Sequence, residues 1–431
     1  MTKRTSPEKL WNEIEKSGGI NAYIEKQLEK RGYLVQRQET MGMSKRELKN
    51  YKQSLKDEAA ERKKLRKESW QAYKSNHIVH LGEGIYWNDG DDFDKWDIEN
   101  PEKRIAENEL PVIDSPEQLA KVLDLTIGKL RWLSYHRDAA TSLHYYRFTI
   151  PKKRGGDRDI WAPMPLLKKT QRWILENIAE KLLVHGAAHG FLPSRSIYTN
   201  AITHRNPFYL IKMDIKDFFP SVSYARVKGI FRKAGYREQV ATLLALICTE
   251  APRKIVEFEG KKHFVSLGQR CLPQGAPTSP ALTNTLCMKM DSRLYGLAKK
   301  FGCRYSRYAD DITFSIPREK LKGFNPGAVI EFTKRIVKDE GFVIHPDKTK
   351  VIRPNVCQRV TGLVVNDDQK PRVSRDIKRK LRAAIHNLKN GKPMQEGDSL
   401  ERLKGIAAYI NMSEPKLGEK YLNELKTFND M

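Results

Sequence analysis

Residues 304–317 read RYSRYADDITFSIP, and this stretch decides the fold. The β-type runs on either side of the turn predict two short strands, with Asp310 and Asp311 at the bend between them. Two carboxylates held close together repel each other, and each raises the other's pKa unless a cation offsets them. A divalent metal removes that conflict, and Mg²⁺ prefers such hard oxygen ligands. The plain alternative is a solvated acidic turn.

A third carboxylate lies upstream. Residues 208–213 (FYLIKM) form an apolar run that predicts a buried strand, which ends on Asp214 shortly before Phe218 and Phe219. A strand ending in Asp, followed later by an Asp-Asp hairpin, is typical of a polymerase palm with a two-metal site. In such a site one metal activates a primer hydroxyl, the other holds the triphosphate and the leaving pyrophosphate, and in-line displacement follows. The alternative is that Asp214 merely caps the next turn.

Three further segments surround these two motifs. Residues 146–163 read as a hairpin with two glycines at its tip and cations at its rim, which suits an anionic ligand. Residues 272–281 (LPQGAPTSPA) form a Pro- and Gly-rich loop that leads into a helix. Residues 345–350 (HPDKTK) follow the Asp-Asp hairpin. Each segment alone is also compatible with ordinary surface structure.

On these motifs, residues 113–431 resemble the reverse transcriptases. The resemblance implies an α/β (α+β) right-hand polymerase fold with an antiparallel palm sheet, fingers and a small helical thumb. It also implies two Mg²⁺ ions, or Mn²⁺ in their place, and deoxynucleoside triphosphates as substrates. The residues expected to hold the metal ions are Asp214, Ile215, Asp310 and Asp311.

The same resemblance assigns residues around the nucleotide. They are Lys153, Arg158, Asp217, Phe218, Phe219, Gln274 and Gly275. Arg158, helped by Lys153, is expected to reach the triphosphate. Phe219 is expected to exclude a ribose 2′-hydroxyl by collision, although it could also be a core residue. Lys348 is the candidate for protonating the leaving pyrophosphate as a general acid, with plain surface lysine as the alternative.

Two short motifs point to the bacterial retron enzymes within that family. Residues 199–204 (TNAITH) contain Asn-Ala-x-x-His, and a Val-Thr-Gly motif follows the lysine segment. On a helix, Asn200 and His204 lie one turn apart and could hydrogen-bond to RNA. The local sequence by itself favours a structural histidine. The RNA-binding residues expected from both motifs are Asn200, His204, Val360, Thr361 and Gly362.

The retron resemblance implies a specific activity. The enzyme would copy a structured non-coding RNA into DNA, primed from a 2′-hydroxyl of that RNA, and give a branched RNA–DNA hybrid (msDNA). It further implies a role in anti-phage defence together with an effector protein. A group II intron-like or other defence-associated reverse transcriptase is one alternative. A catalytically silent RNA-binding scaffold is another, which the intact set of three aspartates argues against.

The composition agrees with a nucleic-acid partner. Among 431 residues, 79 are Lys or Arg and 53 are Asp or Glu, which gives a formal net charge of +26. Such a surplus indicates a polyanionic partner and salt-dependent affinity. No apolar run reaches membrane-spanning length, and five scattered cysteines without a Cys-x-x-Cys pair are typical of reduced thiols. We therefore expect a cytoplasmic protein without a membrane partner or a zinc site.

The charge pattern suggests three parts. Residues 1–112 form an N-terminal extension in which 44–75 reads as a long charged helix. Residues 113–358 would hold the fingers and palm, beginning near a helix start with Ser115 as N-cap. Residues 359–431 would form the thumb, and residues 370–382 read as its basic helix. The thumb residues expected on the nucleic-acid backbone are Arg375, Lys378, Arg379, Lys380 and Arg382.

Overall fold

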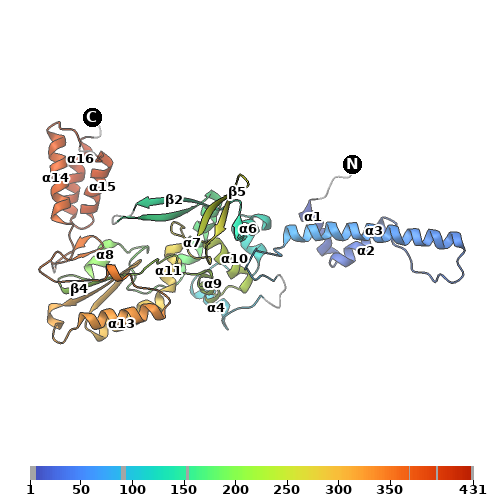
Figure 1. Ribbon diagram of the computed structural model, residues 1–431, viewed down its shortest axis with the longest axis horizontal. Helices are drawn as coiled ribbons and strands as arrows, with labels where there is room; N and C mark the ends of the chain where they lie inside the picture. Colours follow the sequence, from blue (N-terminus) through green and yellow to red (C-terminus); the bar gives the residue numbers. More distant parts are fainter. Residues whose placement is uncertain (1–5, 89–93, 152–154, 368, 395–396, 429–431) are drawn as a thin grey trace.

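The computed structural model describes residues 6–88, 94–151, 155–367, 369–394 and 397–428. Within these ranges the buried apolar side chains form three separate hydrophobic cores. Figure 1 shows an elongated molecule with an arm of N-terminal helices at one end, a central body, and a bundle of C-terminal helices at the other end. No helix in the described ranges is both long enough and apolar enough to cross a membrane.

Residues 7–76, called the arm below, contain three helices. Helices α1 (Pro7–Lys16) and α2 (Ile20–Lys30) pack on α3 (Lys45–Asn76). The expected long charged helix is confirmed, and it begins at a capping box in which Ser44 and Glu47 each bond the other's main-chain N–H. The arm's buried side chains are Ile14, Tyr23, Ile24, Leu28, Leu65 and Ala72.

The segment that follows the arm packs on the body. It contains α4 (Pro101–Glu107), α5 (Pro116–Val122) and α6 (Ile127–Ser134). Its apolar side chains, from Ile78 onward, belong to the same core as the main sheet. Ser115 accepts a hydrogen bond from the Gln118 N–H at the start of α5, so the expected N-cap is confirmed.

The body is built around an antiparallel four-stranded sheet in the order β7-β8-β4-β9. Its strands are β7 (Arg304–Tyr308), β8 (Asp311–Pro317), β4 (Pro207–Asp214) and β9 (Lys350–Ile352). The apolar run that predicted β4 lies at the centre, where both neighbours satisfy its main chain. The helices of the body are α7 (Pro165–Asn177), α8 (Ile197–Ile202), α9 (Tyr224–Lys233), α10 (Glu238–Cys248), α11 (Ser279–Leu286), α12 (Met288–Lys300) and α13 (Pro326–Asp339).

Two smaller sheets accompany the main one. Strands β2 (Tyr145–Pro151) and β3 (Asp157–Pro163) form the expected hairpin. A second sheet, which the sequence did not predict, has the order β1-β6-β5, from β1 (Ala139–Ala140), β6 (Lys261–Ser266) and β5 (Arg253–Phe258).

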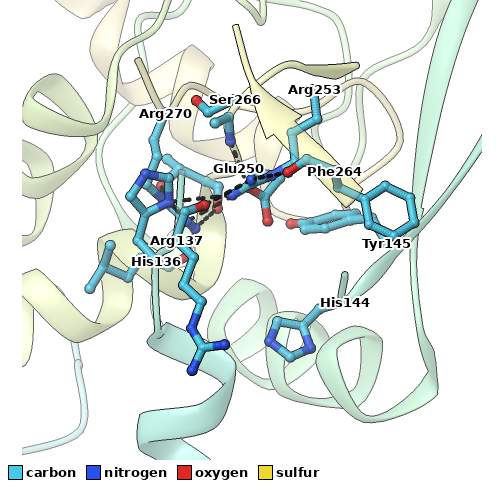
Figure 2. A network of polar contacts seen from close by, with 12 residues as sticks. His136, Arg137, His144, Tyr145, Glu250, Arg253, Phe264, Ser266 and Arg270 are labelled. Carbon is cyan, nitrogen blue, oxygen red and sulfur yellow. Dashed lines mark hydrogen bonds and ion pairs between the residues drawn. The ribbon is translucent and has the colours of Figure 1, made fainter. Parts of the chain in front are cut away.

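A buried polar network joins the β1-β6-β5 sheet to the end of α10 (Figure 2). The Arg253 guanidinium donates to the main-chain carbonyls of Arg137 and Phe264, at 2.8 and 2.9 Å. It also donates to a Glu250 carboxylate oxygen at 3.2 Å. Burial raises the pKa of Glu250, but Arg270 and Arg253 outweigh that effect and hold the pKa below its ordinary value. The carboxylate therefore stays ionised as the link between the two arginines.

The C-terminal part begins with a small hairpin of β10 (Arg359–Val360) and β11 (Leu363–Val364). Helices α14 (Arg375–Lys389), α15 (Leu400–Asn411) and α16 (Pro415–Lys426) form a bundle around their own core. The basic helix was expected to cover residues 370–382, but it begins at Arg375. Arg372 instead exchanges main-chain hydrogen bonds with Val364, which keeps the preceding residues extended.

Candidate active site

The turn between β7 and β8 holds two of the three expected carboxylates. Tyr308 pairs with Asp311, and Ala309 takes a left-handed φ of +54° between them. The turn packs closely against Gly190, because a Cβ on Gly190 would lie 2.8 Å from the Ala309 nitrogen. Only a glycine at that position lets the two segments approach this closely.

A buried ion pair braces the same turn from beneath. Arg307 and Asp291 are fully buried and lie 2.7 Å apart. The Arg307 guanidinium also donates to the Asn284 side-chain oxygen at 3.0 Å and to the Ala309 carbonyl at 3.1 Å. Sequence reasoning missed this brace. Its one local signal is an arginine inside a strand that is otherwise buried, where a charge needs a partner.

Asp214 lies beside this turn because of the sheet register. Its strand pairs with β8 so that Asp214 is opposite Asp311. The next residue, Ile215, donates its N–H to the Asp310 carbonyl at 2.9 Å, and the Asp214 carbonyl accepts from the His345 N–H at 2.7 Å. The three carboxylates, which are far apart in the sequence, therefore meet at one end of the inner strands β4 and β8, as the sequence predicted.

Burial and neighbouring charges raise the pKa of two of the three carboxylates. Burial, followed by the charges of Asp214 and Asp311, raises the pKa of Asp310 to about 6. Burial is also the main cause of the raised pKa of Asp311. One nearby cation offsets part of this charge, since Lys348 Nζ donates to Asp214 Oδ1 at 2.7 Å. The site therefore keeps an excess of negative charge that further cations would relieve.

The donor chemistry of the site suits divalent cations. Carboxylate oxygens are the ligands Mg²⁺ prefers. Burial, together with the charges of neighbouring carboxylates, raises the pKa of Asp310 and of Asp311, and a bound cation would offset both effects. Within the described residues, no group of three or more His, Cys, Asp or Glu side chains is arranged to hold a metal ion as it stands. The cation at this position is Lys348, whose ammonium group donates to Asp214 Oδ1.

Aromatic side chains form a wall beside the carboxylates. Phe219 is partly exposed, and its ring centroid lies 6.4 Å from that of Phe191, which in turn lies 6.4 Å from that of Tyr308. Phe191 was missed from the sequence, where it is only one apolar residue in a loop. Phe218 was expected at the nucleotide, but it is 5% exposed and packs against Phe342. Phe218 is therefore a core residue.

The loop at 272–281 meets the β2–β3 hairpin. The Gln274 carbonyl accepts from the Trp161 N–H at 2.7 Å, and Gly275 has a φ of +122°. A Cβ on Gly275 would lie 2.7 Å from the Trp161 oxygen, so this contact also requires glycine. Arg158 is exposed on the same hairpin, opposite Ile150.

Two other residues expected at the nucleotide need separate mention. Asp217 is exposed, with a left-handed φ of +46°. Lys153 lies outside the described residues.

Asn200 and His204 are placed differently from the RNA-binding prediction. His204 is fully buried, with Nδ1 bonded to the Ser315 hydroxyl and Nε2 to the Ser306 hydroxyl, both at 2.7 Å. Asn200 is 1% exposed and accepts from the same Ser306 hydroxyl at 2.5 Å. Neither side chain reaches the surface. The pair joins α8 to β7 and β8, which is the structural role that the local sequence favoured.

The Val-Thr-Gly motif continues this brace. Val360 is fully buried, and the Thr361 hydroxyl donates to the Ile197 carbonyl at 2.9 Å. Thr361 and Gly362 have left-handed φ values of +45° and +90°. The motif thus makes a tight turn that packs on α8. The prediction that Val360 contacts RNA is therefore wrong, because its side chain is buried.

The basic residues of α14 divide into two groups. Lys378 is mostly buried and paired at 2.9 Å with Glu414, the N-cap residue of α16, so it holds the bundle together and is not a free cation. Lys380 is exposed elsewhere on the helix. An exposed face at helical spacing, free of the bundle core, carries Arg375, Arg379 and Arg382.

Comparisons with known proteins identify the family of the chain. The family model described as "Reverse transcriptase (RNA-dependent DNA polymerase)" matches residues 150–377. The chain is 48% identical to the Retron Mx162 reverse transcriptase of Myxococcus xanthus, over 96% of this chain and 87% of that relative. It is 39% identical to the Retron Mx65 reverse transcriptase of the same organism, over 77% and 75% of the two chains.

A third relative is shorter. The Retron Ec86 reverse transcriptase of Escherichia coli is 31% identical over 74% of this chain and 95% of its own length. Among solved structures, a telomerase from Candida tropicalis aligns with a TM-score of 0.40 and 14% identity, over 68% of this chain and 56% of its own. The family model and the retron relatives together establish that this chain belongs to the retron reverse transcriptases, and is an RNA-directed DNA polymerase.

Proposed function

We propose that this enzyme copies a structured non-coding RNA into DNA, with a 2′-hydroxyl of the same RNA as primer. The product is then a branched RNA–DNA hybrid. The observation that carries the proposal is that Asp214, Asp310 and Asp311 meet at one end of the inner strands β4 and β8. Kinship to retron enzymes over nearly the whole chain supports the mode of priming.

The three aspartates, with the main chain at Ile215, are proposed to hold two Mg²⁺ ions. When bound, these ions supply activation of the primer hydroxyl and stabilisation of the leaving pyrophosphate. Asp310 must be ionised to take part, and its pKa of about 6 leaves it largely ionised at neutral pH. Lys348, now paired with Asp214, is proposed to turn to the pyrophosphate and donate a proton to it.

The nucleotide is proposed to lie between the β2–β3 hairpin and the aromatic wall. Arg158 and Lys153 would bind the triphosphate, and the 272–281 loop would support the nucleotide through Gln274 and Gly275. Asp217 would lie at the edge of this pocket. Phe219 would exclude ribonucleotides by collision with the 2′-hydroxyl, because its ring is partly exposed beside the carboxylates.

The parts of the chain are assigned by the same proposal. Residues 113–358 form fingers and palm, and 359–431 form a thumb whose exposed arginines on α14 follow the template–primer backbone. Residues 1–112 form the extension, of which 7–76 have a core of their own. A role in anti-phage defence with an effector protein belongs to the proposal through retron kinship alone.

The test is the nucleic acid that copurifies with the full-length protein expressed together with its neighbouring genomic sequence. Wild type should carry DNA joined to RNA through a 2′–5′ linkage, and Asp310→Asn should carry the RNA without DNA. Recovery of intron RNA with both proteins would contradict the retron assignment. Failure of wild type to extend oligo(dT) on poly(rA) would instead favour a silent scaffold.

A further inference from the structure

One face of α3 carries a straight row of seven lysines, called the lysine stripe below. At about 100° per residue, these side chains and Trp70 fall within about 60° of the helix circumference. From Lys45 to Lys74 the row extends about 44 Å at about 1.5 Å per residue. The stripe consists of Lys45, Lys49, Lys52, Lys56, Lys63, Lys67 and Lys74, all exposed.

The acidic residues of α3 are kept off this face. By the same helical geometry, all five lie on the opposite half of the helix. Two of them are engaged inside the arm: Glu58 pairs with Arg37 and Arg62, and Glu61 pairs with Arg31. An ordinary solvated helix mixes both signs of charge on one face. Segregation this complete leaves a row of positive charge without local compensation.

The stripe has no acidic partner within the described part of the chain, since none of its seven lysines forms an ion pair there. Its only cation–π contact there is that of Lys74, whose Nζ lies 5.8 Å from the ring centroid of Trp70. Trp70 stacks on Tyr73, with ring centroids 5.2 Å apart, and Tyr73 stacks on His77. Figure 1 shows α3 as one continuous helix along the arm, so the row follows a single helix axis.

The form of the stripe decides what it fits. The stripe of a second copy is excluded as a partner, because two lysine stripes repel each other. A membrane surface needs an apolar flank, and the stripe offers Trp70 alone. Lysine ammonium groups are point charges suited to phosphates rather than to base edges. A rigid row of them gains most from phosphates that are already held in line, since a flexible strand must first be ordered.

We propose that the lysine stripe binds the sugar–phosphate backbone of double-helical RNA. This rests on the proposed function in one respect, that the enzyme's own RNA is structured and offers such helices. The arm then holds a stem of the RNA outside the polymerase site. The contact is independent of sequence and does not touch the reacting atoms.

The test compares two triple variants of the full-length protein. The stripe variant is Lys49→Gln, Lys56→Gln and Lys63→Gln. The control variant is Lys16→Gln, Lys26→Gln and Lys30→Gln, which removes the same charge from exposed positions on α1 and α2. None of these three lysines forms an ion pair with another described residue. The probe is a fluorescein-labelled RNA hairpin with a stem of about 16 base pairs, titrated at several salt concentrations and followed by fluorescence anisotropy.

The stripe variant should bind the hairpin at least about tenfold more weakly than wild type at low salt, and its salt slope should be shallower by about 2 to 3. The control variant should change little. Equal losses in both variants would show that net charge alone matters and would overturn the proposal. So would an equal loss on an unstructured single strand, or hairpin binding that stays intact while binding to anionic lipid vesicles or to a copurifying protein is lost.

This outcome is independent of the test for branched DNA. Far-ultraviolet circular dichroism checks that the helical arm stays folded in both triple variants, because the arm has a core of its own. Synthesis on oligo(dT)-primed poly(rA) checks the body, since neither variant alters a residue of the proposed site. If wild type makes the branched product and the stripe variant binds the hairpin as tightly as wild type, the arm proposal alone is refuted. If the stripe variant loses hairpin binding but wild type makes no branched product, the priming proposal alone is refuted.

Discussion

At the scale of single residues, Asp310 is the most informative position. We expect Asp310→Asn to lower DNA synthesis by orders of magnitude, because it removes one of three carboxylates that would hold the metal ions. RNA binding should stay near the wild-type level, since Asp310 is not part of a basic surface. Primer extension and RNA titration with the same preparation check both statements. Near-normal synthesis would refute the two-metal assignment.

The same variant should change how stability depends on pH. The ordinary pKa of the Asp310 carboxyl is 3.8, and in the folded protein it is about 6. Between these values the folded protein binds the additional proton, so the metal-free wild type should lose stability as pH rises from about 4 to 6. Asp310→Asn should lack that loss and be the more stable protein above pH 6. Thermal unfolding in chelator across this range measures it.

Phe219 allows a second prediction at this scale. Phe219→Ala should accept ribonucleotides, because the collision with the 2′-hydroxyl disappears. The ring is only partly buried, so the loss of stability should stay well below the 3 to 5 kcal/mol typical of a core phenylalanine. Competition between ribo- and deoxynucleotides in primer extension gives the ratio. An unchanged ratio, or an unfolded variant, would show that Phe219 belongs to the core like Phe218.

At the scale of elements, His204 joins α8 to two strands of the main sheet. His204→Ala should cost about 2 to 4 kcal/mol, because it leaves a cavity, leaves the buried Ser315 hydroxyl without its partner, and removes one hydrogen bond of the Ser306 hydroxyl. DNA synthesis on generic and cognate templates should fall together. A selective loss on the cognate RNA would revive the RNA-contact prediction.

His204 also gives an acid-side signature. Burial first, and then Arg304, lowers its pKa to about 3. The unfolded chain therefore binds a proton near pH 6.5 that the folded protein refuses, and wild type should lose stability as pH falls below that value. Denaturation curves of wild type and His204→Ala should converge toward low pH. Parallel curves would show that the buried imidazole is not the cause.

The elements that could be predicted from the sequence are those whose pattern lies within one short segment. The Asp-Asp hairpin, the strand ending on Asp214, and the long charged helix α3 follow from short patterns, and all are confirmed. The brace of Arg307 and Asp291 depends on residues from different elements. Its one local signal, an arginine inside a buried strand, does not identify the partner. His204 shows the same limit, because one motif fits both RNA contact and a buried hydrogen-bond network.

At the scale of the whole molecule, the net charge of +26 should appear as a steep salt dependence. Replacing Arg375, Arg379 and Arg382 of α14 by Gln should weaken generic and cognate templates alike and flatten that dependence by up to about 3. The matched comparison for one charge is Lys380→Gln against Arg382→Gln alone, because Lys380 is exposed on another side of the same helix. A loss confined to the cognate template would contradict a general grip on the backbone.

The separate core of the arm has a consequence for heat. Six buried residues support it, against several dozen in the body, so the arm should melt first and on its own. Calorimetry should therefore show a small early transition, which Leu65→Ala shifts downward without moving the main one. In a warming cell the enzyme would lose its hold on the distant stem while still adding nucleotides, so fidelity to its own RNA would fail before synthesis does.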